Sequence, residues 1–139
     1  MCRFRAQLVS FLLLILAAAI ALSCGSSSSH IPQSVTLSPA TADGTSGPVR
    51  FTATALYNTM PSPVSPAPAT WGACGANGNN DGVSVSTSGL AQCTSGPAQT
   101  YIIFAFVPDP NFKGIGGSES TPCAGSCGGV VGTAQLTCP

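Results

Sequence analysis

Glycine, proline and serine interrupt the chain so often after residue 24 that only short segments between them can form regular structure. The 139 residues include 16 glycines and 12 prolines, and proline breaks a helix because it lacks an N–H and clashes with the preceding turn. Between the breaks, short segments rich in valine, threonine and alanine alternate apolar and polar residues. This pattern predicts a small all-β sandwich, with no helix of useful length after residue 24.

Seven segments show the strand pattern: 34–39, 49–57, 69–74, 83–86, 90–93, 101–107 and 130–138. The second is the clearest strand, and its alternate apolar residues predict one buried face, formed by Val49, Phe51, Ala53 and Ala55. In the third, Trp71 is the expected core anchor.

Three longer connections separate these segments. Residues 40–48 are rich in aspartate, glycine and serine and predict a turn region. Residues 60–68 hold four prolines and predict an irregular connection. Residues 108–129 form a long insert before the last strand, and long loops of this kind usually have a structural or functional reason.

Charged side chains are too few to support most kinds of function. Only two basic residues follow residue 24, Arg50 and Lys113, so nucleic-acid binding has no electrostatic basis. The single histidine, His30, precedes the first expected strand, which leaves no Ser-His-Asp triad in the folded part. The acidic residues all fall in expected turns or loops: Asp43, Asp81, Asp109 and Glu119. We therefore expect no enzymatic activity and no cofactor.

The N-terminus has the three parts of an export signal. Arg3 and Arg5 precede an apolar run over residues 8–22 that only Ser10 interrupts, and small residues follow it. The run is shorter than the roughly 20 residues that span a bilayer, so a retained membrane anchor is the least favoured interpretation. Residues 1–23 are therefore expected to be a signal peptide.

Residues 21–24, Ala-Leu-Ser-Cys, resemble the lipobox of bacterial lipoproteins, although alanine stands where leucine is usual. The resemblance implies cleavage before Cys24 and a lipid on that cysteine. Residues 24–33 would then hold the lipidated Cys24 and a flexible serine-rich tether. An A-x-A site at residues 19–21 also allows plain cleavage and secretion. We expect a bacterial cell-envelope location, on either membrane face, with secretion as the alternative.

Five stretches occur in an order that resembles the bacterial immunoglobulin-like domain, group 2: 35–39, 51–55, 69–71, 83–91 and 132–137. The resemblance covers residues 34–138. It implies an immunoglobulin-like antiparallel sandwich of about seven strands over residues 34–139. The 108–129 insert is longer than the usual hairpin of that family, and cysteines are not part of its general pattern. Members occur in surface adhesins and as spacer modules, which implies no particular activity.

The up-and-down strands of that family also imply how the cysteines are distributed. They place the ends of three strands, with Cys74, Cys93 and Cys138, at one rim, and the insert with Cys123 and Cys127 at the other. A disulfide needs Cα atoms within about 7 Å, so a bridge from Cys127 along the last strand to Cys138 is not expected. We expect the pairs Cys74–Cys93 and Cys123–Cys127, with Cys138 left over. In an exported protein, disulfides are favoured over a zinc or cluster site on these cysteines.

Residues 77–82 fit the front half of a calcium loop, with side-chain oxygens from Asn77, Asn79 and Asp81. The twelfth position of that loop would be Ser88 instead of glutamate, and only one carboxylate is present. A tight turn between strands accounts for the same residues. The favoured interpretation is the turn, so no metal site is expected.

The segment 101–107 is the most apolar after the signal. The family resemblance places Tyr101, Ile103 and Ala105 inward, which leaves an outer row of three apolar side chains: Ile102, Phe104 and Phe106. A sheet face in water does not usually carry such a row. Either the 108–129 insert covers it, which is favoured, or it is a contact surface for a partner.

These expectations favour a cell-envelope lipoprotein that carries a non-catalytic immunoglobulin-like binding or structural module. A membrane would hold it through the lipid, while a protein or glycan partner stays open. The alternative is a secreted carbohydrate-binding or hydrolase-accessory protein. Such a protein needs exposed aromatic side chains, and the available ones are expected to be largely buried: Tyr57, Trp71 and Tyr101.

Overall fold

The computed structural model describes residues 29–76, 78, 80–112 and 128–139, and all regular structure in this part of the chain is β-strand. The strands are β1 (Pro32–Ser38), β2 (Thr41–Asp43), β3 (Val49–Arg50), β4 (Thr52–Tyr57), β5 (Thr70–Cys74), β6 (Val83–Val85), β7 (Leu90–Cys93), β8 (Gln99–Pro108) and β9 (Gly129–Cys138).

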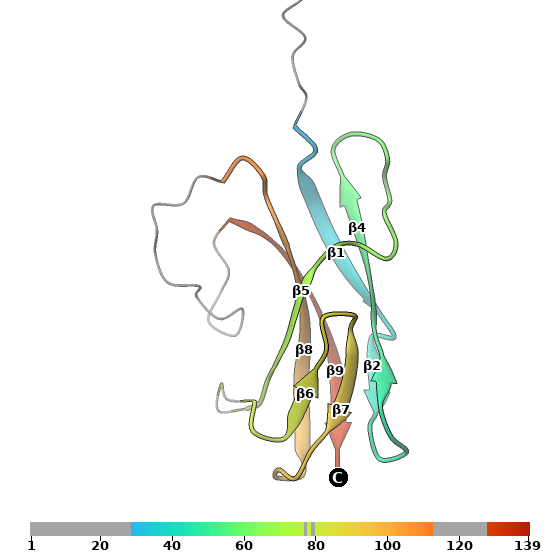
Figure 1. Ribbon diagram of the computed structural model, residues 1–139, viewed down its shortest axis with the longest axis vertical. Helices are drawn as coiled ribbons and strands as arrows, with labels where there is room; N and C mark the ends of the chain where they lie inside the picture. The colour runs from blue at the N-terminus through green and yellow to red at the C-terminus, as the bar shows by residue number, and fades with distance from the viewer. Residues whose placement is uncertain (1–28, 77, 79, 113–127) are drawn as a thin grey trace, which may run out of the picture.

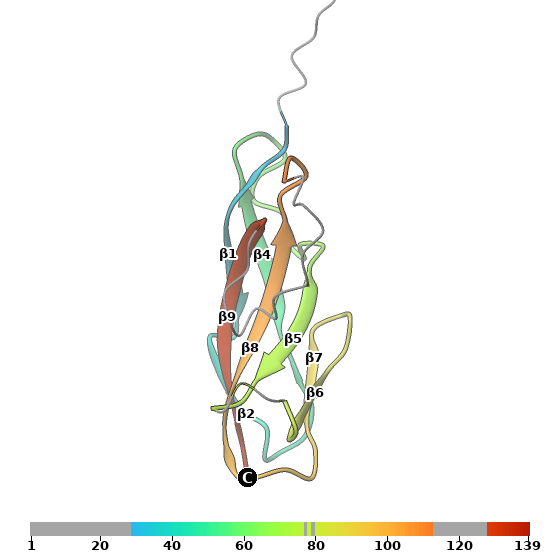
Figure 2. The same cartoon turned by 90° about the vertical axis from the view of Figure 1, so that its left-hand side faces the viewer.

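The strands lie in two layers that pack face to face (Figures 1 and 2). One layer has the order β2-β9-β8-β5. In the other layer β1 pairs with β4, and β3 pairs with β7, which pairs with β6. Phe51 alone separates β3 from β4, so one stretch of chain joins the two halves of this second layer. The predicted all-β sandwich is confirmed.

The expected strand over residues 49–57 changes partners at Phe51. Before it, Val49 and Arg50 pair with β7; after it, β4 pairs with β1. The Phe51 N–H donates to the carbonyl of Gly89 at 2.8 Å, so the break leaves no backbone donor unsatisfied. The predicted buried face is confirmed: Phe51, Ala53 and Ala55 are buried, and Val49 packs against them.

The predicted turn over residues 40–48 contains a short strand instead. Residues Thr41–Asp43 form β2, which runs parallel to the end of β9, while every other strand pair is antiparallel. The partner of β2 lies more than ninety positions along the chain, from Gln135 to Thr137. Local turn residues therefore could not reveal it.

The core between the layers consists of alternate side chains from both sheets. Its largest fully buried members are Tyr101, Phe51, Ile103 and Leu136. The predicted inward orientation of Tyr101, Ile103 and Ala105 is confirmed, because all three are fully buried. Since successive residues of a strand point to opposite faces, their neighbours on β8 point out of the sandwich.

The proline-rich connection over residues 60–68 runs back along β4 on the side not occupied by β1. Val64 and Ala55 exchange two backbone hydrogen bonds, and the Ala67 N–H donates to Ala53. Prolines in this segment have no N–H to offer a further strand. The connection therefore protects an edge that would otherwise be open to pairing with another chain.

In the described part of the chain, no helix has the length and apolar character needed to cross a membrane. The predicted signal peptide, Cys24 and the first part of the tether lie outside the described residues. The strand predicted from Ser34 begins at Pro32, so the ordered domain starts slightly earlier than the sequence suggested.

Candidate functional site

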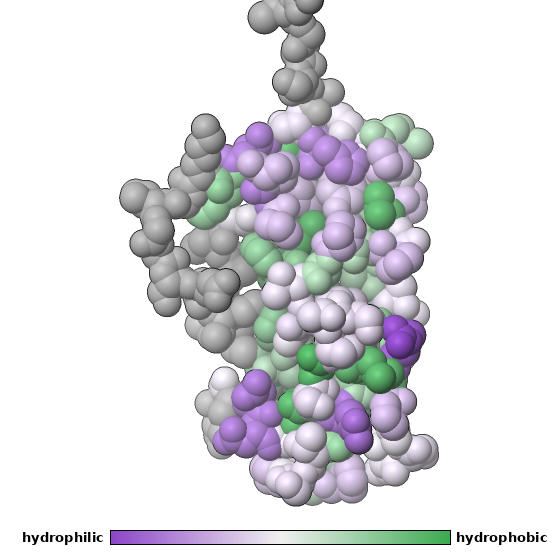
Figure 3. Space-filling model, in the orientation of Figure 1, coloured by the Kyte–Doolittle hydropathy of each residue, from purple (hydrophilic) through white to green (hydrophobic). Residues whose placement is uncertain are grey.

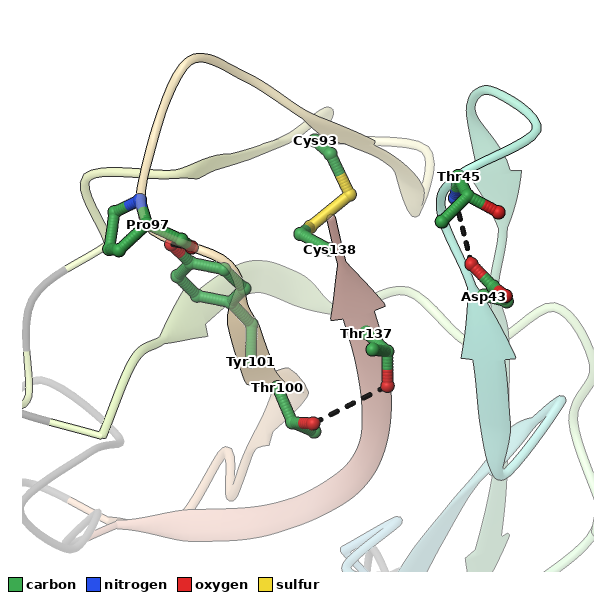
Figure 4. Close-up of a disulfide and its surroundings, with 8 residues drawn as sticks. All are labelled: Asp43, Thr45, Cys93, Pro97, Thr100, Tyr101, Thr137 and Cys138. Carbon is green, nitrogen blue, oxygen red and sulfur yellow. Dashed lines mark hydrogen bonds between the residues drawn. A yellow bond between two sulfur atoms is a disulfide. The ribbon is translucent and has the colours of Figure 1, made fainter.

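One disulfide, Cys93–Cys138, joins the two layers (Figure 4). Cys93 is the last residue of β7 and Cys138 the last of β9, and the two strands belong to different layers. Their Cα atoms are 5.7 Å apart. Cys138 is buried and Cys93 packs against the core cluster, so the bridge closes the interior at this end. We call this the disulfide end: Cys93, Cys138 and the adjoining strand ends.

The predicted pair Cys74–Cys93 is therefore wrong, and Cys138 is not the unpaired cysteine. The alternation of side chains along β5 is the physical reason. Ala73 belongs to the core cluster, so Cys74 points to the opposite, outer face of its sheet, beside Ile102. Cys93 lies two residues after the buried Ala91 and therefore points inward.

The sequence contains this signal. Trp71 was expected to be inward-facing, and Cys74 follows it by three positions, an odd number that places it on the opposite face. Cys74 is itself disulfide-bonded, although not to Cys93. The predicted Cys123–Cys127 pair lies outside the described residues.

Small residues allow close packing around the bridge. A side chain at Gly44 would collide with Cys93 Sγ, so the turn after β2 lies directly against the disulfide. A side chain at Gly82 would likewise collide with the hydroxyl of Tyr101. That hydroxyl donates a long hydrogen bond of 3.5 Å to the carbonyl of Pro97 (Figure 4). The disulfide end is consequently filled by packed side chains.

Asp43, the last residue of β2, lies opposite Thr137 at the disulfide end, and a local hydrogen bond lowers the pKa of its carboxyl group. The backbone N–H of Thr45 donates to Asp43 Oδ1 at 2.8 Å. This bond, together with the Thr45 hydroxyl, holds the pKa of the exposed Asp43 carboxyl below its ordinary value of 3.8, because both bonds favour the charged form. The arrangement is an Asx-type turn that closes β2, and the bond accounts for the perturbation without a ligand.

The predicted outer row on β8 is not a uniformly open surface. Ile102 is 37% exposed, whereas Phe104 is only 8% exposed and Phe106 is half-buried. The Phe104 ring lies over Gly72 on β5, where any side chain would collide with it. The proposed contact surface is therefore reduced in this structure to Ile102. Most of the insert that was expected to cover the row lies outside the described residues.

The proposed calcium ligands are only partly described. Asn77 and Asn79 lie outside the described residues, and Asp81 is exposed in the turn before β6. Hydrogen bonds from the N–H groups of Gly82 and Val83 to the carbonyl of Asn80 form this turn. Among the described residues, no three histidine, cysteine, aspartate or glutamate side chains are close enough together to hold a metal ion.

Of the three aromatic residues that the carbohydrate-binding alternative would need, Tyr101 is buried as expected. Trp71 is half-buried, and its ring lies within 3.0 Å of where a Cβ at Gly89 would be, so it packs under the turn between β6 and β7. Tyr57 is half-buried and is in contact with His30. None of the three is a fully open sugar-stacking platform.

His30 was expected to lie in the flexible tether, but it packs on the sandwich. Its ring stacks on that of Tyr57, with centroids 3.8 Å apart and planes 12° from parallel, and Nδ1 is hydrogen-bonded to the Thr59 hydroxyl at 2.9 Å. Ile31 and Asn58 exchange two further hydrogen bonds. The tether is thus fixed at residue 30. We call this the tether end: residues 30–32, 56–60 and 108–112, at the opposite end from the disulfide (Figure 1).

Sequence reasoning missed this attachment because no motif marks it; only the pairing of β1 with β4 brings residues 30 and 57 together. No family model and no curated protein compared with the chain matches it.

Proposed function

We propose that this protein is a cell-envelope lipoprotein, anchored through Cys24, that carries a non-catalytic immunoglobulin-like module for binding or for structural spacing. The export signal and the lipobox-like residues 21–24 support the anchor. The attachment of the tether at His30 supports a defined orientation of the module on that anchor.

The observation that carries the immunoglobulin-like part of the proposal is the strand order. In the immunoglobulin fold, strands A, B, E and D form one sheet, and strands C, F and G form the other. Here β1, the β3–β4 stretch, β7 and β6 have the first order, and β5, β8 and β9 have the second. The short β2 adds a parallel strand beside β9. This agreement supports the resemblance to the bacterial immunoglobulin-like domain, group 2.

The chemistry of the described surface supports a passive role. Asp43 ends β2, and Asp81 and Asp109 lie in two different connections; among the described residues, no three histidine, cysteine, aspartate or glutamate side chains are close enough together to hold a metal ion. His30, the single histidine, is engaged with Tyr57 and Thr59. A module of this kind acts through its surface and its position, so its place at the membrane is central to its function.

Metabolic labelling with radioactive palmitate, followed by membrane fractionation, tests this proposal. The wild type should carry the label and sediment with the membrane. Cys24→Ala should lose the label and appear in the soluble fraction, while Cys2→Ala should keep both properties because Cys2 leaves with the signal peptide. An unlabelled wild type, or a labelled Cys24→Ala variant, would contradict the proposal.

A further inference from the structure

The large apolar side chains that are exposed on the described surface gather at the tether end. Leu56, Met60, Ile102 and Phe112 are the four exposed ones, and only Ile102 lies away from that end. Met60 is 81% exposed and directly follows Thr59, the partner of His30. Leu56 is 46% exposed and lies opposite Ser34, near the start of β1.

Phe112 reaches the same end from the other layer. It is 54% exposed and follows β8, whose last residue, Pro108, pairs with the first residue of β9. The start of β9 lies beside the start of β1, because a side chain at Gly132 would meet Val35. Figures 1 and 2 both place the turn after β8 and the segment after β4 at the end where the chain enters. In Figure 3, apolar atoms reach the surface at the corner formed by the segment after β4.

The tether is too short to hold this end far from a membrane. Only five residues separate Cys24 from His30, where the chain becomes fixed. The covalent geometry of the chain limits this stretch to a span of about 20 Å. The headgroup layer of one leaflet is itself roughly 5–8 Å thick. The tether end therefore stays at the bilayer surface whenever Cys24 is lipidated.

Most of the described aspartates lie away from the tether end. Asp43 lies beside Thr137 and Asp81 lies close to the start of β6, so both belong to the disulfide end. Of the described carboxylates, only Asp109 lies at the tether end. Anionic lipids give a membrane surface a negative potential, and this arrangement keeps two of the three described aspartates away from such a surface.

We infer that the tether end is a lipid-contact surface, in which Met60 and Phe112 insert their apolar side chains to the boundary between the headgroups and the acyl chains of the bilayer that holds Cys24. This inference rests on the proposed lipidation. The lipid on Cys24 keeps the tether end at a high effective concentration next to the bilayer. Two apolar side chains are therefore enough for this end to bind the bilayer, whereas a protein without an anchor would need more. It fixes the tilt of the module and directs the disulfide end outward.

Quenching of tryptophan fluorescence by brominated acyl chains tests the inference. The lipidated full-length protein is extracted from membranes, its acyl chains are verified by mass, and it is reconstituted into vesicles of phosphatidylglycerol and brominated phosphatidylcholine. The wild type has one tryptophan, Trp71, which gives the background. Met60→Trp should add strongly quenched emission, at least several-fold more than Ser46→Trp, an exposed control in the turn after β2.

The outcomes separate the two proposals. If Cys24 carries acyl chains but Met60→Trp is quenched no more than Ser46→Trp, the lipid-contact surface is wrong while the lipoprotein proposal stands. If Met60→Ser instead dissociates a dimer of the lipidated protein in detergent, the surface belongs to a second copy of the chain and the inference is also overturned. If Cys24 carries no acyl chain, both proposals fail together.

Discussion

At the residue scale, the Cys93–Cys138 disulfide is the one covalent link between the layers that the described residues contain. It closes a loop of 45 residues in sequence separation, so chain entropy alone predicts a stabilisation of about 4 kcal/mol. Cys93→Ala combined with Cys138→Ala should lower the free energy of unfolding by about that amount in urea denaturation. Thr100→Ala with Thr137→Ala removes a nearby exposed hydroxyl pair and should cost less than about 1 kcal/mol.

A double cysteine variant no less stable than the threonine control would contradict the structural role of this bridge. A non-reducing peptide map that joined Cys74 to Cys93 would contradict the pairing itself.

Gly89 is required both for its backbone conformation and for its close packing, and a comparison with Gly78 separates these two contributions. Gly89 and Gly78 both have φ of 78°, but only Gly89 has neighbours: the Phe51 carbonyl and the Trp71 ring. Gly78→Ala should cost about 1 kcal/mol, the conformational penalty alone. Gly89→Ala should cost about 3 kcal/mol, because the added side chain also collides with the Phe51 carbonyl and the Trp71 ring. Equal losses of stability, measured by thermal unfolding, would show that these two contacts are unimportant.

At the element scale, local pattern was enough to predict most strands but not their partners. The alternation from Val49 to Ala55 depends only on which face is buried, and it predicted that face correctly. The change of partner at Phe51 and the strand β2 depend on chain that is distant in sequence, so neither leaves a local signal. The predicted disulfide pairing was wrong for a related reason: it rested on the rim that the strand ends share, whereas Cys74 lies on the outer face of its sheet.

The turn after β2 should make a small pH-dependent contribution to stability. The Thr45 N–H lowers the folded-state pKa of Asp43, so the bond stabilises the fold fully above the ordinary value of 3.8 and is lost as the pH falls through the lowered value. The stability difference between the wild type and Asp43→Ala, measured in urea at several pH values, should therefore be constant near neutrality and shrink in acid. A difference that grows on acidification would contradict this assignment.

The attachment of the tether should be measurable as local stability. His30→Ala removes both the stack on Tyr57 and the bond to Thr59 and should cost about 1 kcal/mol. Thr59→Val removes only the bond and should cost less. The backbone amides of Ile31 and Asn58 donate the two hydrogen bonds that join these residues. Their hydrogen exchange should accelerate more in His30→Ala than in Thr59→Val. Unchanged exchange in both variants would show that the tether is not fixed at residue 30.

At the scale of the whole molecule, the two ends of the sandwich differ in composition. The tether end carries exposed apolar side chains and the attachment of His30. The disulfide end carries the covalent bridge between the layers. If Cys24 carries the proposed lipid, the short tether defines which of these two ends can meet the membrane. The β-domain that the sequence predicted is confirmed, whereas the difference between its two ends follows only from which residues the strand pairing brings together at each end.

The mass of the mature N-terminal peptide tests the central claim most directly. The protein is isolated from a membrane fraction and digested, and the peptide that ends at Arg50 is measured. We predict a peptide that begins at Cys24 and carries the added mass of acyl chains on that residue. A peptide that begins at Leu22, or at Cys24 with an unmodified thiol, would contradict the account.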